Sequence, residues 1–585
     1  MAACPPLFRL MSGNRLSQLL YIFADDNQEI INIMSNMNKT LSALALVLAC
    51  TFGQNDTVMA QAQTQAAVAR PKLVVGIVVD QMRWDYLYRY ADRYGTGGFK
   101  RLLGEGFTCE NAFITHLPSY TAVGHSTIFT GSVPAIHGIT GNGWTDQALG
   151  REFYCTEDST VTPVGTTSDA GKMSPRNLLA STITDELRLA TNFRSKVVGV
   201  SLKDRASILP AGHIANGAFW LDDSNASFVT SSYYMKELPE WVKQFNARNE
   251  PAELMSKPWE TLYPINTYVQ SSEDDVTWEN TYKGETSPKF PHDLPAIYKV
   301  SKGSLRATPN GNTLTLDFAK AAVNGYNMGS GPVTDFLTIN CASTDYVGHQ
   351  FGPNSIEVED TYLRLDKDLA TFFTFLDQKV GKGNYLVFLT ADHGASHSVG
   401  FLKAHDIPSG LVNDNAIITG LTADLKNTFG VDSLVKGSNN YHVDFDVQRI
   451  KAAKLDYDAV KKETVYYLQT VPGIQFAADL DNIGNSALPE PIKQMAINGY
   501  YPKRDGAVIM IPDPGWYEGS LKGTTHGTWA PYDTHIPMVF MGWHVKHGYT
   551  NEKTSMTDIA ATVAAMLKIQ MPSGCVGRAV MEVYK

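Results

Sequence analysis

The chain has 585 residues, a formal net charge of -10 at pH 7 and a pI near 5.8. A net acidic surface does not attract nucleic acid or anionic membranes, so the composition argues against non-specific binding to either. The length allows several average domains or one large domain with insertions, and it places no limit on building a hydrophobic core.

The N-terminus contains a pattern typical of an export signal. Residues 37–40 include the charged Lys39 and precede an apolar run over residues 41–49, which is too short to cross a bilayer as a mature helix. We interpret residues 37–62 as a signal peptide and residues 1–36 as an over-extended gene start outside the fold. The protein is therefore expected in the periplasm or secreted, without a transmembrane helix in the mature chain.

Two cleavage sites fit this leader. The small-x-small stretch from Ala60 to Ala62 suits an ordinary signal peptidase, and this is the site that we favour. The alternative is cleavage before Cys50, because residues 47–50 weakly resemble a bacterial lipoprotein signal. In that case Cys50 would carry a lipid anchor.

Four cysteines follow the leader, without a CxxC pair and without the spacing of a zinc ribbon. We therefore expect Cys109, Cys155, Cys341 and Cys575 to be poor metal ligands. In an oxidising compartment Cys109 and Cys155 are able to form a disulfide, and buried free thiols are an equally good interpretation.

The first core element is a continuous apolar, β-branched run over residues 72–80, which ends in Asp80. This pattern is typical of a strand buried on both faces of a parallel sheet. Similar runs recur, with helix-like patterns between several of them, at residues 195–201, 334–340, 385–391, 507–511 and 538–541. The alternation predicts an α/β fold with a mostly parallel central sheet flanked by helices.

Apolar residues at helical spacing predict a long helix over residues 356–380 and another over residues 555–569. Two stretches, at about 215–330 and 395–500, are rich in Pro, Gly, Asn and aromatic residues and have no sustained period. We interpret them as insertions that form a cap on a single domain spanning residues 71–585. The sequence has no internal repeat or heptad array, which argues against a solenoid or a coiled coil.

Acidic and histidine residues follow three of the predicted strands, and one further histidine lies in a Thr-Thr-His-Gly-Thr segment. The set consists of Asp80, Asp345, His349, Asp392, His393 and His526. Ligands bind outside the carboxyl ends of the strands in open α/β sheets, so these side chains are expected to converge. Mixed carboxylate and imidazole donors suit zinc, and three of each divide into two sites with three protein ligands.

Thr121 is a candidate nucleophile. It follows a strand-like run at residues 112–115 and begins a helical pattern that continues toward Gly131. A hydroxyl at a helix N-terminus lies where backbone amides favour an anion. Threonine is a weak nucleophile at its free pKa, but coordination to zinc is able to activate it. The alternative is that Thr121 only caps the helix.

The order of these short motifs resembles one known superfamily. The motifs are Val-Val-Asp80, Thr121-x-x-Gly-His, Asp345-x-x-x-His349, Ala-Asp392-His393-Gly and Thr-His526-Gly. In this order they make the chain similar to the alkaline phosphatase superfamily and, within it, to the phosphate-irrepressible, PafA-type bacterial enzymes. The resemblance covers essentially the whole mature chain and implies one alkaline-phosphatase-like catalytic domain.

This resemblance implies a site with two zinc ions, about 4 Å apart. It assigns one ion to Asp345, His349 and His526, and the other to Asp80, Asp392, His393 and Thr121. Thr121 would then attack phosphorus and form a covalent phosphothreonine, which water hydrolyses. The implied activity is hydrolysis of phosphate monoesters to inorganic phosphate and an alcohol, at neutral to alkaline pH.

Three further residues match positions that contact phosphate oxygens in PafA-type enzymes: Asn142, Lys203 and Arg205. A Lys and Arg pair meets the extra charge of a monoester dianion with charge-assisted hydrogen bonds, which favours monoesters over diesters. Lys203 also stands where other alkaline phosphatases bind magnesium, so no third metal ion is expected. Without the resemblance, the pair would be interpreted as a solvated strand end and Asn142 as a turn residue.

Three other histidines are not assigned to metal. His125 and His137 follow Thr121 closely and are expected to be packed structural donors. His535 is expected to support the ligands rather than to bind an ion.

Two rival functions remain. A nucleotide pyrophosphatase or phosphodiesterase of the same superfamily shares the ligands and the threonine but prefers diesters. An exported binding protein that keeps the fold without catalysis is the second rival. Sulfatase chemistry is disfavoured because the sequence has no Cys-x-Pro-x-Arg motif. The expected partners are small-molecule phosphate monoesters rather than nucleic acid, and the chain is expected to act as a monomer.

Overall fold

The computed structural model describes residues 68–147 and 149–584 of the chain. Residues 70–585 form one compact unit. The predicted gene-start extension at 1–36, the signal peptide at 37–62 and the alternative lipid-anchor site at Cys50 lie outside the described residues. In the part that is described, no helix combines the length and the hydropathy needed to span a bilayer.

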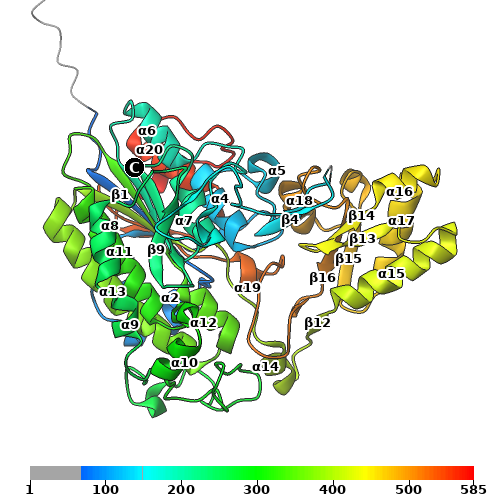
Figure 1. Cartoon of the computed structure of the whole chain (residues 1–585), viewed down its shortest axis with the longest axis horizontal. Helices are drawn as coiled ribbons and strands as arrows, with labels where there is room; N and C mark the ends of the chain where they lie inside the picture. Colours follow the sequence, from blue (N-terminus) through cyan, green and yellow to red (C-terminus); the bar gives the residue numbers. More distant parts are fainter. Residues whose placement is uncertain (1–67, 148, 585) are drawn as a thin grey trace, which may run out of the picture. The chain divides into compact units, whose positions relative to one another are not determined.

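The core of the described chain is a ten-stranded sheet with a parallel centre (Figure 1). The central strands β11, β1, β10, β7 and β8 run parallel, antiparallel pairs flank them on both sides, and the outermost pair, β19 with β2, is again parallel. In sheet order the strands are β19 (Gly548–Thr550), β2 (Phe107–Cys109), β18 (Met538–Gly542), β11 (Tyr385–Thr390), β1 (Leu73–Val79), β10 (Asp335–Cys341), β7 (Val197–Val200), β8 (Gly217–Asp222), β9 (Ser227–Ser231) and β6 (Pro163–Val164). The predicted α/β fold with a mostly parallel sheet is therefore confirmed.

The three middle strands are buried along their whole length, which explains their unbroken apolar runs. Close packing between β1 and β11 depends on Gly76, because a Cβ there would lie 2.5 Å from Cζ of Phe388. Such a tight centre fixes the register of these strands, and the register determines where their carboxyl ends lie.

Several helices pack around the sheet. α11 (Asn310–Gly325) contacts β10 and β7, and α7 (Asp204–Ala211) contacts β7 and β8. The helix predicted at 356–380 is α13 (Ile356–Leu376), followed by a π-helical turn to Gly381. The helix predicted at 555–569 is α20 (Asp558–Leu567). The shorter helices outside the four-stranded sheet and its helices are α2 (Tyr86–Arg89), α3 (Phe99–Glu105), α4 (Thr121–Thr130), α5 (Pro134–His137), α6 (Ile183–Ala190), α8 (Glu240–Ala247), α9 (Glu250–Leu254), α10 (Leu294–Val300), α12 (Ser343–Phe351), α14 (Val399–Ala404) and α19 (Pro531–Thr534).

A second sheet has four antiparallel strands in the described chain and is coloured yellow to orange in Figure 1. In sheet order these are β13 (Val435–Asn439), β14 (His442–Phe445), β16 (Val508–Pro512) and β15 (Ile474–Asp479). α15 (Asp414–Phe429) and α17 (Tyr457–Leu468) pack on it and share its own apolar core, while α16 (Val447–Ala452) and α18 (Glu490–Gly499) complete the segment. We call residues 410–512 the cap sheet segment.

The strand predicted at 507–511 belongs to this second sheet, so its assignment to the central sheet was wrong. An apolar, β-branched run predicts a buried strand but does not say which sheet buries it. β16 also extends the insertion expected at 395–500 beyond its predicted end.

The stretch expected as the first cap insertion, 215–330, differs from that expectation in part. β8 and β9 belong to the central sheet, and α11 packs on β10. Its aromatic residues are core residues, since the rings of Phe228 and Phe318 stack with centroids 3.7 Å apart. This stretch is therefore rich in aromatic residues, without a clear hydrophobic period, because its side chains are buried on two sides and not because it forms a surface cap.

All four cysteines in the described chain are free. Cys109 belongs to the main hydrophobic cluster around the central sheet, whereas Cys155 belongs to a separate small cluster. The disulfide between them is therefore not formed in this structure, and the interpretation as buried thiols holds for both.

Candidate metal centre

The acidic and histidine residues singled out in the sequence lie at one edge of the central sheet. Three neighbouring parallel strands, β1, β10 and β11, end there. Asp80 follows β1, Asp345 and His349 lie on α12 after β10, and Asp392 and His393 follow β11. His526 lies in the loop between β17 (Trp516–Glu518) and α19. The carboxyl ends of parallel strands meet at a common edge, so residues far apart in sequence become neighbours.

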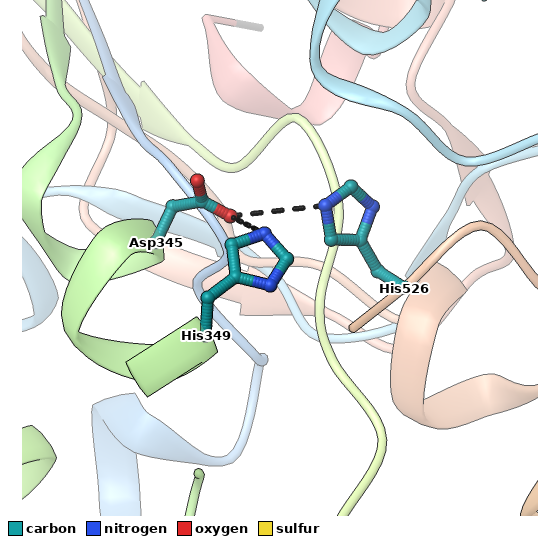
Figure 2. A group of neighbouring side chains, drawn as sticks. All are labelled: Asp345, His349 and His526. Atoms are coloured by element: carbon teal, nitrogen blue, oxygen red, sulfur yellow. Dashed lines mark ion pairs between the residues drawn. The ribbon is translucent and has the colours of Figure 1, made fainter. Parts of the chain in front are cut away.

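One group of three side chains is drawn in Figure 2. His349 Nε2 lies 3.1 Å from Asp345 Oδ1, and His526 Nε2 lies 3.7 Å from the same oxygen. Asp345 and His349 are four residues apart on α12, which places them on one face of the helix. The three ligand atoms lie within 4.8 Å of one another, so this group is able to hold a metal ion.

A second cluster surrounds Asp80. His393 Nε2 lies 3.7 Å from Asp80 Oδ1 and 3.4 Å from Asp392 Oδ2. Two overlapping groups with metal-binding geometry share Asp80: one adds Asp345 and His393, and the other adds His125 and Asp392. His125 was expected to be only a packed donor, and its place in one of these groups makes it a further candidate ligand.

The chemistry of this cluster fits a cation. Asp80 Oδ1 and Asp392 Oδ2 are fully buried and have no hydrogen-bond partner within the described chain. Burial raises the pKa of Asp80 well above its ordinary value, and the Asp392 carboxylate raises it further. A buried carboxylate oxygen that is left without compensation costs several kcal/mol, on the order of 5, unless it is paired or coordinates a metal. A divalent ion among these oxygens removes that cost.

The three histidines of the site are oriented by the backbone. Each places Nδ1 near a carbonyl oxygen, so Nδ1–H donates and Nε2 faces the carboxylates. His349 Nδ1 lies 2.7 Å from the carbonyl oxygen of Thr524. His393 Nδ1 lies 3.0 Å from that of Gly394, and His526 Nδ1 lies 2.8 Å from that of Ser119. Burial lowers the pKa of His393 and His526. Both rings are therefore neutral, which is the form that binds metal.

Thr121 is the first residue of α4, and its side chain is almost fully buried. The N-cap position belongs to Tyr120, without a side-chain cap, so the interpretation of Thr121 as a simple N-cap was wrong. Thr121 Oγ1 lies 3.4 Å from His393 Nε2. α4 approaches the loop after β11 closely at Gly124, where a Cβ would lie 2.2 Å from the Asp392 carbonyl oxygen.

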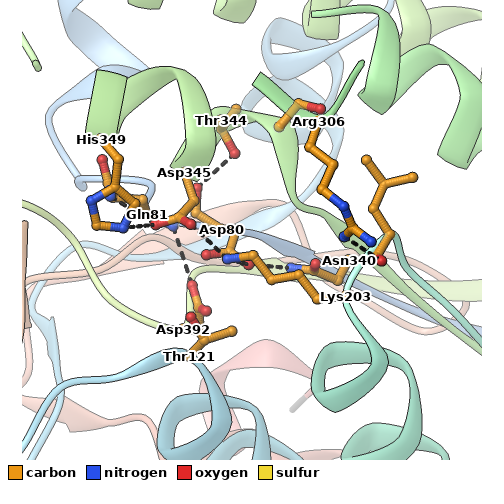
Figure 3. A network of polar contacts seen from close by, with 12 residues as sticks. Asp80, Gln81, Thr121, Lys203, Arg306, Asn340, Thr344, Asp345, His349 and Asp392 are labelled. Atoms are coloured by element: carbon orange, nitrogen blue, oxygen red, sulfur yellow. Dashed lines mark hydrogen bonds and ion pairs between the residues drawn. The ribbon is translucent and has the colours of Figure 1, made fainter. Parts of the chain in front are cut away.

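Lys203 lies between the two clusters and not in solvent (Figure 3). Its Nζ is 2.6 Å from Asp345 Oδ2 and 3.0 Å from Asp80 Oδ2. Burial alone would lower the pKa of Lys203, but the two carboxylates raise it above its ordinary value, so the ammonium remains charged. The interpretation of this residue as a solvated strand end was wrong.

Arg205 and Asn142 lie beside these residues. Arg205 Nη1 donates to the hydroxyl of Tyr154 at 3.0 Å, and its buried Nε has no partner among the described residues. Asn142 Oδ1 accepts a hydrogen bond from the backbone N–H of Ala122 at 3.0 Å. Asn142 is thus attached to the helix that begins with Thr121.

Sequence patterns missed several neighbours of the site. Gln81 and Asn340 donate hydrogen bonds to site carboxylates, and Tyr154 contacts Arg205. The only local signal for Gln81 was its place next to Asp80. His535 stacks between aromatic rings on β3 (Ala112–Phe113) and at Trp84, with centroids 4.6 Å away on each side.

A family model described as type I phosphodiesterase / nucleotide pyrophosphatase matches residues 74–549. The chain belongs to this family. Alkaline phosphatase PafA of Elizabethkingia meningoseptica is 56% identical over 528 residues, covering 90% of this chain and 96% of that protein. Alkaline phosphatase PhoV of Synechococcus elongatus is 51% identical over 550 residues, covering 94% of this chain and all of that protein.

Solved structures agree with this membership. The crystal structure of PafA matches with a TM-score of 0.87 at 56% identity, covering 89% of this chain and 100% of that one. A second crystal structure is of a PafA variant in which a threonine, an asparagine, a lysine and an arginine are substituted. The resemblance to PafA-type alkaline phosphatases inferred from the motifs is confirmed.

Proposed function

We propose that this member of the type I phosphodiesterase / nucleotide pyrophosphatase family is an alkaline phosphatase, with Thr121 as its covalent nucleophile. Its relatives at 56% and 51% identity carry the name alkaline phosphatase. The observation that carries the proposal is the position of Thr121, at the N-terminus of α4 and beside two clusters with metal-binding geometry. A nucleophile, an anion-favouring helix end and cation sites are together what phosphoryl transfer requires.

The proposed metal content is two zinc ions. One would be held by Asp345, His349 and His526, and the other by Asp80, Asp392 and His393 beside Thr121. When bound, such a pair lowers the pKa of the hydroxyl and stabilises charge on the leaving oxygen. The ammonium of Lys203 supplies the positive charge next to both clusters, so we propose no magnesium ion.

The protein side chains divide the remaining work. Thr121 Oγ1 forms the bond to phosphorus while the ester oxygen departs opposite to it, and water later releases inorganic phosphate from the threonine. Asn142, Lys203 and Arg205 bind the non-bridging oxygens. The same four residue types are those substituted in the PafA variant, which supports this assignment. Two fixed cations suit the dianion of a monoester better than the single charge of a diester.

The nucleophile is tested by acid-quenching the purified enzyme with a ³²P-labelled aryl phosphate. Thr121→Ala should yield no labelled protein, whereas Thr121→Ser retains a hydroxyl and should still become labelled. Thr130→Ala is the matched control, because Thr130 lies at the other end of α4 and bonds only to backbone groups nearby. Labelling of Thr121→Ala at the wild-type level would refute the assignment.

The family model keeps a phosphodiesterase as the second candidate. The ratio of kcat/KM for an aryl phosphate to that for a bis-aryl phosphate separates the two. A ratio well above one supports the monoesterase, and a ratio below one means that Lys203 and Arg205 do not meet the extra phosphate charge. Elemental analysis addresses the remaining rival, a silent binding protein, because fewer than two zinc ions per chain would contradict the two-metal site.

We also propose that the chain is exported through the leader at residues 37–62 and acts as a monomer. N-terminal sequencing of the mature protein distinguishes cleavage after Ala62 from lipidation at Cys50. Light scattering of the same sample tests the monomer.

A further inference from the structure

Gln81 connects the two ligand clusters. Its backbone N–H donates to Asp392 Oδ1 at 3.2 Å, and its side-chain Nε2 donates to Asp345 Oδ1 at 2.8 Å. The residue is 4% exposed, and Figure 3 shows it between these carboxylates. One residue thereby holds a carboxylate on α12 and another in the loop after β11.

The backbone of Gln81 has an unfavourable conformation. Its φ is 62°, in the left-handed region that non-glycine residues rarely occupy, at a cost of about 1 kcal/mol. Such a conformation persists only where the surroundings determine it. Here both hydrogen bonds to the ligand carboxylates depend on it, because the same turn directs the N–H to one cluster and the side chain to the other.

Gly348 leaves the space that the Gln81 side chain occupies. A Cβ at Gly348 would lie 2.0 Å from Gln81 Oε1. Gly348 is inside α12 and is absent from the positive-φ positions of the described chain, so its own backbone does not require glycine. A glycine inside a helix costs about 0.5–1 kcal/mol relative to alanine. The position of the Gln81 amide explains why that cost is present here.

We propose that Gln81 is a positioning residue for the metal site and that Gly348 acts through it by leaving room for its amide. This inference rests on the proposed function. Asp345 Oδ1 is also the oxygen nearest to His349 and His526, so the hydrogen bond from Gln81 fixes the oxygen that faces the candidate ion. A neutral amide orients this oxygen without neutralising it, and it leaves a lone pair for a metal.

The test measures zinc affinity of the mature chain by competition with a chromophoric chelator. Gln81→Met keeps the side-chain length and removes the donor, and we expect zinc to bind about 10- to 100-fold more weakly, as for other residues that orient ligands. Gly348→Ala should weaken binding similarly, because its Cβ displaces the amide. Gln81→Ala removes the side chain with which the new Cβ clashes. Adding Gly348→Ala to Gln81→Ala should therefore leave the zinc affinity equal to that of Gln81→Ala alone, and it should raise Tm because alanine has a higher helix propensity than glycine.

Gly420→Ala is the matched control. Gly420 lies inside α15 of the cap sheet segment, and a Cβ there would lie 2.0 Å from Tyr467 Oη. The clash is thus of the same kind but away from the ligands, so Tm is expected to change and zinc affinity is not. This control separates general destabilisation from an effect on the metal site.

The outcomes are distinguishable from failure of the proposed function. If the wild-type chain binds no zinc, the proposed two-metal site fails. If the wild type binds two ions and Gln81→Met binds them within twofold of wild type, only the positioning role is overturned. If Gly348→Ala weakens zinc binding equally in the wild-type and Gln81→Ala backgrounds, Gly348 acts independently of the Gln81 amide. That result overturns the proposed role of Gly348 even if Gln81→Met does not fold.

Discussion

Replacement of Lys203 by methionine should destabilise the metal-free protein far more than the zinc-loaded protein. The Lys203 ammonium lies 2.6 Å from Asp345 and 3.0 Å from Asp80, and its side chain is 1% exposed. Removing one partner of a buried ion pair costs about 3–5 kcal/mol, because a charge remains buried without compensation. Bound zinc would compensate the same carboxylates, so the loss should shrink when zinc is present.

Calorimetry measures this difference. Unfolding entropy is about 2 cal/mol/K per residue, so one kcal/mol corresponds to about 1 °C in a unit of this size. Lys203→Met is therefore expected to lower the Tm of chelator-treated protein by about 3–5 °C. Scans are compared at one heating rate, because large proteins often unfold irreversibly.

Lys461→Met is the matched control for this prediction. Lys461 is also a buried lysine among carboxylates, with Nζ 2.8 Å from Asp481 and 3.1 Å from Asp479, but it lies in the cap sheet segment. Its effect on Tm should be the same with and without zinc. A metal-free Lys203→Met protein within 1 °C of wild type, or a loss that zinc does not reduce, would refute the reasoning.

Three further results are expected. Arg205→Ala should lower kcat/KM for an aryl phosphate by about 10- to 100-fold, with a smaller effect on a bis-aryl phosphate, because it removes a charge-assisted hydrogen bond; equal losses on both substrates would contradict this. Asn440→Gly preserves a backbone φ of 54° but removes the 2.8 Å hydrogen bond to the Gly143 carbonyl. It should lower monoester kcat/KM by up to about tenfold, whereas Asn249→Gly, at a φ of 51°, should not. Burial lowers the pKa of His116 to about 4. As the pH falls, the His116 ring is therefore protonated in the unfolded chain before it is protonated in the folded protein. The free energy of unfolding should fall by about 3 kcal/mol as the pH is lowered from 6.5 to 4. His116→Asn should flatten that part of a plot of Tm against pH, and an unchanged slope would exclude His116 as the cause.

The central sheet could be predicted because its middle strands are buried on both faces. β1, β10 and β11 are continuous apolar runs, and this is the clearest strand signal that a sequence contains. The same signal failed to separate β16 from the central sheet, because burial alone does not identify the neighbouring strand. The aromatic stretch around Phe228 was misjudged for a related reason, since its rings pack against a helix about 90 residues later.

The candidate site could be predicted where chemistry and strand ends coincide. Asp80, Asp345 and Asp392 follow neighbouring strands, so their convergence follows from topology. Their metal ions and catalytic roles remain proposals. Gln81 was missed because its partner Asp345 is 264 residues away and neither the type nor the spacing of Gln81 indicates a ligand. His125 was expected to be only a packed donor, because its place in the sequence does not show that Asp80 and Asp392 lie beside it.

One of the contacts of the cap sheet segment with the residues around α4 is made by a tight turn. Asn440 and Tyr441, both with positive φ, join β13 to β14, and the Asn440 amide holds the carbonyl of Gly143 next to Asn142. Asn142 is therefore supported from one side by α4, which begins with the proposed nucleophile Thr121, and from the other by a body with its own apolar core. Under the proposed function, substitutions in that separate core would change how Asn142 is held, and with it phosphate affinity, while the residues of both clusters stay the same.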